Sequence, residues 1–277
     1  ETVFHNARVE FTLQYPVLLA PLRATDDEVT IDRKLRATAA FVDILIARRA
    51  VNYLSLTYSQ MAYSLFQVIS RIRGLPVDEL IPALHRELDE LGCDFSGTTD
   101  GRRRGMSAFS LNQWSKRYIR YILARITDFI EQQSGMTSRL SEYLTTSGRN
   151  RYEIEHIGAN HSDRHQDEFP DGQGFADYRN RIGGLLLLPK SFNASYGDMT
   201  YEDKSQYYVR ENLLASSLTA LCYERNPGFR GLIDRSELPF RPYAEFKRAD
   251  LDERQALYQS IAEQVWSPDR LDGVVTR

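Results

Sequence analysis

One stretch of the chain, residues 150–210, breaks the helical periodicity found on either side of it and limits the fold more than any other feature. The segment NRYEIEHIG alternates polar and apolar residues as a β-strand does, and residues 182–188 form a second short apolar strand that Pro189 ends. Thr200 and Asp203 resemble a capping box at the start of a helix. The predicted order is strand, loop, strand, helix. Such a unit is too small to bury much of a core alone, so we expect it to be embedded in a larger domain.

The rest of the sequence predicts helices, because apolar residues recur there at spacings of three and four. We expect these helices at residues 37–54, 55–73, 76–91, 118–130 and 251–266, the last of them packing back on the domain. The predicted fold class is therefore mainly α, a helical domain with an embedded small ββα unit. The predicted regions are a helical region at 1–149, the ββα unit at 150–230 and a C-terminal helical segment at 231–277.

The composition fits a folded protein of the reducing cytoplasm. No apolar run approaches the roughly 20 residues that a membrane span needs, and Cys93 and Cys222 have no metal-type spacing. The net charge of −3 does not indicate a nucleic-acid-binding protein, although the arginines at 102–104 could form a local basic stripe. Because the chain begins at Glu1, in sequence that already reads as structured, we expect it to be the C-terminal part of a longer protein.

Histidine is concentrated in one place, since His156, His161 and His165 are three of the five in the chain. His156 follows Glu155 at the end of the first predicted strand, where an acid and a histidine can set a metal ligand beside a general base. A bound Mg²⁺ or Mn²⁺ would polarise a phosphate, as phosphodiester hydrolysis requires. His161 and His165 have the spacing of two helical zinc ligands, but no cysteine supplies the others. A polar loop or a DNA contact is the better interpretation of this pair.

These residues resemble a known family, the HNH (ββα-metal) nuclease domain of GmrSD-like type IV restriction proteins. The resemblance rests on YEIEHI at 152–157, NRIGGLLLLPKSFNASYGD at 180–198, and Lys204. It implies that His156 is the general base that activates water. It also implies that Glu155 and Asn193 hold a divalent metal, Mg²⁺ or Mn²⁺, and that Lys204 contacts a phosphate.

The chain departs from the family pattern at Gly184, where the family has an asparagine that braces the loop between the strands. We expect Asn180, four residues earlier, to take over this bracing, so Asn180 joins His156 and Asn193 among the predicted catalytic residues. The predicted DNA contacts are Lys204, Arg181, His161 and His165.

Two functional hypotheses follow from the resemblance. In the first, the protein is a metal-dependent DNA endonuclease, the effector of an anti-phage restriction system, and it nicks DNA because one such site cleaves one strand; an RNA target is a lesser variant. In the second, it is a catalytically degenerate DNA-binding or regulatory module, because Gly184 has removed the bracing side chain.

GmrSD-like proteins, and the similar SspE-type proteins of phosphorothioate-dependent phage defence, join such a domain to an N-terminal nucleotide-hydrolysing sensor domain. This chain has no P-loop, so its expected partners are that domain and phage or modified DNA, with no membrane.

Overall fold

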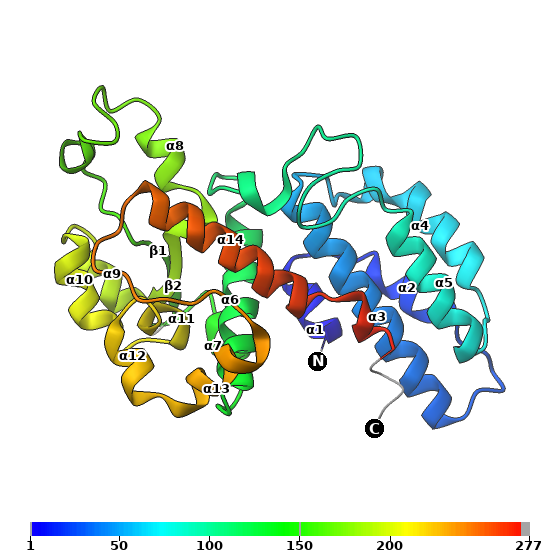
Figure 1. Cartoon of the computed structure of the whole chain (residues 1–277). Helices are drawn as coiled ribbons and strands as arrows, with labels where there is room; N and C mark the ends of the chain where they lie inside the picture. Colours follow the sequence, from blue (N-terminus) through cyan, green and yellow to red (C-terminus); the bar gives the residue numbers. More distant parts are fainter. Residues whose placement is uncertain (1, 150, 273–277) are drawn as a thin grey trace. The chain divides into compact units, whose positions relative to one another are not determined.

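The computed structural model of the protein describes residues 2–149 and 151–272. Glu1, Asn150 and residues 273–277, which include the first residues of the expected helical region and of the expected ββα unit, lie outside the described residues. The chain forms two compact units: unit 1 consists of Glu1–Gly105 and Trp266–Arg277, and unit 2 of Met106–Val265. Helices dominate each unit, and the described residues contain a single two-stranded sheet (Figure 1). The mainly α fold class is therefore confirmed.

The two units do not follow the three expected regions. Residues 106–149, which the sequence analysis assigns to the first helical region, belong to unit 2 together with the strands. Residues 231–265 belong to unit 2 as well. The three-part division stays a prediction about how the chain is organised.

Unit 1 is built around one long helix, α3 (Glu28–Val51), whose middle turns are buried on all sides. Asp27 caps the start of α3 by accepting a hydrogen bond from the Thr30 backbone N–H. Near the C-terminal end of the chain, Trp266 Nε1 and Arg270 Nη1 bind the buried Asp43 of α3 at 3.0 and 2.9 Å. The other helices of unit 1 are α1 (Thr2–Arg8), α2 (Gln14–Leu19), α4 (Tyr58–Ile72), α5 (Val77–Asp89) and the 3₁₀ helix η4 (Pro268–Arg270).

Unit 2 packs its helices around the buried helix α6 (Lys116–Gln133) and the small sheet (Figure 1). Helix α14 (Arg248–Val265) lies against α6 and against the 3₁₀ turn η3 (Ile182–Gly184), as expected of a last helix that packs back. The remaining elements are η1 (Gly105–Ala108), α7 (Leu140–Tyr143), η2 (Ser162–His165), α8 (Phe175–Arg179), α9 (Lys190–Tyr196), α10 (Tyr201–Tyr208), α11 (Leu213–Ser216), α12 (Ala220–Arg225) and α13 (Pro227–Ser236). Within residues 2–149 and 151–272, no helix combines the length and the apolar content that a membrane span requires.

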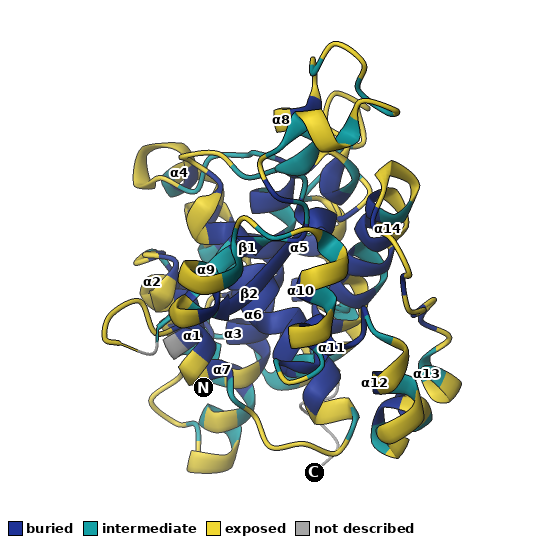
Figure 2. Ribbon diagram, turned by 90° about the vertical axis from the view of Figure 1, so that its left-hand side faces the viewer, coloured by how far each residue is buried: buried dark blue, intermediate teal, exposed yellow. Residues whose placement is uncertain are grey.

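The sheet consists of β1 (Tyr152–His156) and β2 (Leu185–Pro189), paired antiparallel with His156 opposite Leu185. The four leucines of β2 are buried, as Figure 2 shows by their dark blue ribbon. Alternate residues bond across the strand pair, and this alternation includes the bonds just beyond its ends, from Ile157 N to Gly184 O and from Lys190 N to Arg151 O. The carbonyl groups of Ile154 and His156 therefore face the open edge of β1, where side chains from the following helices reach them.

Both predicted strands are present, but the second begins at Leu185 and not at Ile182, because Ile182–Gly184 form the 3₁₀ turn η3. The segment after β2 also differs from the prediction. The helix expected after the capping box is α10, and the Thr200 hydroxyl accepts from the Asp203 backbone N–H at 3.3 Å, as predicted. A further helix, α9, starts immediately at the end of β2 and was not predicted. Its sequence, KSFNASY, lacks strong helical periodicity, and α9 forms because it packs against both strands.

Candidate active site

His156 is the last residue of β1, and its imidazole is half-buried beside the end of α8. His156 Nε2 lies 2.9 Å from Asn180 Oδ1. Because an amide oxygen only accepts, Nε2 carries the proton and donates it, which leaves the lone pair on Nδ1. Burial, aided by the charge of Arg179, lowers the pKa of His156 to about 4, against the hydrogen bond that His156 donates to Asn180, which raises it. The imidazole is therefore neutral at pH 7 and able to accept a proton at Nδ1.

The lowered pKa of His156 predicts how the stability of the folded protein changes with pH. The unfolded chain protonates His156 near pH 6.5, whereas the folded protein does so only near pH 4, so the unfolded state binds more protons between these values. The stability associated with a neutral His156 is present above pH 6.5 and is lost as the pH falls towards 4. Urea unfolding from pH 4 to 7 should show a smaller loss in His156→Gln than in the wild type, because glutamine binds no proton in this range. Equal losses in the two proteins would contradict the lowered pKa.

Arg179, the last residue of α8, is a neighbour of His156 that the sequence analysis missed. Its Nε donates to the Gly158 backbone oxygen at 2.8 Å. Asn180, the next residue, binds the His156 ring, so two consecutive side chains hold the segment just after β1. The one available signal was an arginine directly before the asparagine, and arginine is common throughout this chain.

Glu155 and Lys204 form a buried ion pair instead of facing solvent. Lys204 Nζ lies 2.6 Å from Glu155 Oε1, and the two side chains are 0% and 7% exposed. The same ammonium donates to the His156 backbone oxygen at 2.9 Å. Burial raises the pKa of the Glu155 carboxyl and lowers that of the Lys204 amine, while their mutual attraction opposes both shifts. The phosphate contact expected of Lys204 stays a prediction, and the geometry gives this lysine a different task, which is to hold the end of β1.

Asn193 lies in α9 against the open edge of β1. Its Nδ2 donates to the Ile154 backbone oxygen at 3.4 Å. Its Oδ1 is buried and has no hydrogen-bond partner among the described residues. An unpaired buried amide oxygen is a suitable ligand for a hard cation such as Mg²⁺.

The two metal ligands expected from the resemblance thus differ in their surroundings. Asn193 offers a free oxygen, whereas the carboxylate of Glu155 is already compensated by Lys204. The part of the chain that the structure describes contains no group of three or more His, Cys, Asp or Glu side chains arranged to hold a metal. Of the two predicted ligands, Asn193 therefore fits a divalent cation and Glu155, in this arrangement, does not.

The other predicted DNA contacts, Arg181, His161 and His165, interact with groups other than His156. Arg181 Nη1 pairs with Asp252 at 2.7 Å, and its Nη2 donates to the Ser107 backbone oxygen. His161 Nε2 lies 3.0 Å from Asp198. The ring of His165 stacks on Phe175 with 5.0 Å between centroids. Their roles in DNA binding stay predictions.

Gly184, the departure from the family pattern, lies close to α14 and to the backbone of Arg179. A Cβ at this position would lie 2.8 Å from Leu251 Cδ1 and 3.2 Å from the Arg179 backbone oxygen. At the adjacent Gly183, a Cβ would lie 2.6 Å from backbone atoms of α14, and the Gly183 N–H donates to Gln255 Oε1 at 2.6 Å. An asparagine at 184 would require α14 to move its Leu251 side chain.

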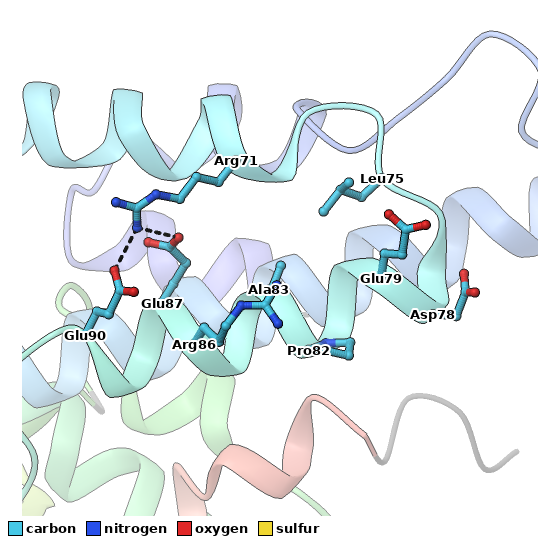
Figure 3. A pocket seen from close by; sticks show the side chains of 9 residues that line it. All are labelled: Arg71, Leu75, Asp78, Glu79, Pro82, Ala83, Arg86, Glu87 and Glu90. Atoms are coloured by element: carbon cyan, nitrogen blue, oxygen red, sulfur yellow. Dashed lines mark hydrogen bonds and ion pairs between the residues drawn. The ribbon is translucent and has the colours of Figure 1, made fainter.

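Unit 1 carries a hollow of about 470 Å³ along α4 and α5, shown in Figure 3. Arg71 crosses it and binds Glu87 and Glu90, each at 2.8 Å. Asp78 and Glu79 also line it, so carboxylates outnumber the basic side chains. This acidic lining disfavours nucleic-acid phosphates, and the hollow is not the site that the histidines indicate.

A neutral histidine with one ring nitrogen held by a hydrogen bond is chemically able to act as a general base at the other. A family model described as GmrSD restriction endonucleases, C-terminal domain, matches residues 100–259, more than half of the chain, and the chain belongs to this family. The match contains every predicted site residue, and the family's description points to a nuclease that acts in restriction. No curated protein and no solved structure matches the chain.

Proposed function

We propose that unit 2 is an HNH-type DNA endonuclease in which β1, β2 and α9 form the ββα-metal unit and His156 is the general base. The observation that carries this proposal is the 2.9 Å contact between His156 Nε2 and Asn180 Oδ1. Because Nε2 donates its proton to Asn180, the basic lone pair of the ring lies on Nδ1, away from Asn180. The order strand, strand, helix supports it. Membership of a restriction endonuclease family supports it independently.

In the proposed reaction, His156 Nδ1 accepts a proton from water, and the water oxygen forms a bond to the phosphorus of DNA. The bond from phosphorus to the 3′ oxygen breaks, and the leaving oxygen takes a proton from solvent. Asn180 keeps the imidazole in the reactive tautomer. A divalent cation, Mg²⁺ or Mn²⁺, held with the help of Asn193 Oδ1, would supply charge stabilisation on the phosphate when bound.

The single site implies that one strand is cut at a time, so nicking is the expected product. As the effector in phage restriction, the domain would act with a nucleotide-hydrolysing sensor domain that recognises modified DNA, phosphorothioate DNA among the candidates. The buried Glu155–Lys204 pair favours the second hypothesis, a DNA-binding module that has lost its chemistry, because it occupies one expected metal ligand.

A supercoiled plasmid assay with Mg²⁺ or Mn²⁺ tests the proposal. We expect metal-dependent conversion to open circle that EDTA prevents. Retardation of DNA on a gel with no conversion in either metal would contradict the nuclease and support the binding module.

Asn193→Ala should raise the metal concentration needed for half-maximal nicking. Loss of an outer-shell partner alone costs about 10–100-fold in metal affinity or activity, and loss of a direct ligand should cost at least as much. Ser191→Ala, an exposed position on the same helix, is the matched control and should titrate like the wild type. An unchanged metal titration in Asn193→Ala would remove this residue from the metal site.

A further inference from the structure

The protein binds the guanidinium of Arg179 through one nitrogen, Nε, and makes no hydrogen bond to the other two, Nη1 and Nη2, within the described residues. Its Nε donates to the Gly158 backbone oxygen at 2.8 Å, which anchors the side chain. Within residues 2–149 and 151–272, its Nη1 and Nη2 make no hydrogen bond or ion pair with the protein, and the residue is half-buried. The planar outer edge of the guanidinium, the part that binds carboxylates and phosphates through two parallel hydrogen bonds, is therefore available.

The unbound edge of the Arg179 guanidinium lies near His156, because Arg179 and Asn180 are consecutive residues that both bind the segment around His156. Asn180 holds the His156 ring, and Arg179, the residue before it, holds the carbonyl of Gly158, two residues after His156. The two side chains thus bracket the segment 156–158. The guanidinium is near enough to act electrostatically on both His156 and Glu155.

The other cations expected at this site are already engaged. Lys204 is fully buried against Glu155, and Arg181 is paired with Asp252. A phosphate beside His156 would bring negative charge to a place where both NH2 groups of Arg179 are unused.

We propose, on the basis of the proposed nuclease function, that Arg179 is a catalytic residue that binds the non-bridging oxygens of the scissile phosphate. When water attacks phosphorus and the bond to the 3′ oxygen breaks, negative charge accumulates on those non-bridging oxygens. Arg179 donates two hydrogen bonds to them while His156 Nδ1 takes the proton of the water. Because the guanidinium is anchored before substrate arrives, little reorganisation is needed when the charge develops.

The test is single-turnover nicking and DNA affinity, measured on wild type, Arg179→Met, Arg179→Lys and a control, Arg230→Met. Arg230 lies exposed on α13. Arg179→Met should lower the nicking rate ~10²–10³-fold, with the dissociation constant, measured in EDTA, changed only a few-fold. Arg179→Lys should recover little of the rate, because an ammonium does not reproduce the two parallel hydrogen bonds. Arg230→Met should nick at the wild-type rate, and circular dichroism should show all four proteins equally folded.

The outcomes separate this inference from the proposed function. If the wild type nicks and Arg179→Met nicks at the same rate, the catalytic role of Arg179 is wrong and the nuclease stands. If Arg179→Met loses affinity by the same factor as rate, Arg179 holds DNA in the ground state and the catalytic role is again wrong. If the wild type does not nick at all, the proposed function itself fails.

Discussion

Replacing His156 with alanine is expected to remove plasmid nicking while leaving the protein folded. General-base catalysis contributes about 10²–10⁴-fold to rate. Among the described residues, His156 is the histidine that Asn180 binds, so no second base is held in the same way. The imidazole is half-buried at the end of a short strand, so its loss should leave the helices intact. The measurement is the rate of open-circle formation, beside thermal unfolding followed by circular dichroism.

His85→Ala is the control for histidine removal as such, because His85 lies in unit 1 and pairs with Asp272. The control should nick at the wild-type rate. Nicking by His156→Ala at more than about a tenth of the wild-type rate would show that another group activates the water, since the loss would then fall short of the usual contribution of a base.

Replacing Lys204 with methionine is expected to have the largest effect on stability. The change leaves the Glu155 carboxylate buried without its cation and removes a donor from the His156 carbonyl. Removing one partner of a buried ion pair typically costs about 3–5 kcal/mol. Urea unfolding should show this loss, whereas Lys190→Met, at an exposed lysine of α9, should unfold like the wild type.

The double variant Glu155→Met with Lys204→Met should recover much of the lost stability, because it leaves no buried charge. The same proteins separate the two roles considered for Lys204. If Lys204 binds a phosphate, Lys204→Met should reduce the salt dependence of DNA binding by about one phosphate contact and leave stability unchanged. That result would show that Lys204 does not stabilise the end of β1 through its ion pair with Glu155.

The sequence predicted the elements around the site better than the contacts within it. The strands were predictable because polar and apolar residues alternate in one, and a leucine run ending at Pro189 forms the other. The contact between His156 and Asn180 joins residues 24 apart, and it depends on how α8 closes the loop between the strands. No local pattern specifies that closure.

Lys204 shows that a resemblance can suggest a role without predicting the contacts of the side chain. A lysine in a helix near a histidine suggests a phosphate contact, since lysine is almost never fully buried unless it is paired. Its exposure depends on Glu155, which is 49 positions earlier in the chain. Gly184 is similar, because the α14 side chain that a Cβ at this position would meet, Leu251, lies far along the sequence.

The contacts of Trp266 and Arg270 with Asp43 set an order for folding during synthesis. Unit 2 is complete once Val265 has emerged from the ribosome, but unit 1 includes Trp266 and Arg270, which bind Asp43. Domains usually fold in the order in which they are made. Within this sequence, the unit that begins first can finish only after the other, so unit 2 is complete before Asp43 meets Trp266 and Arg270.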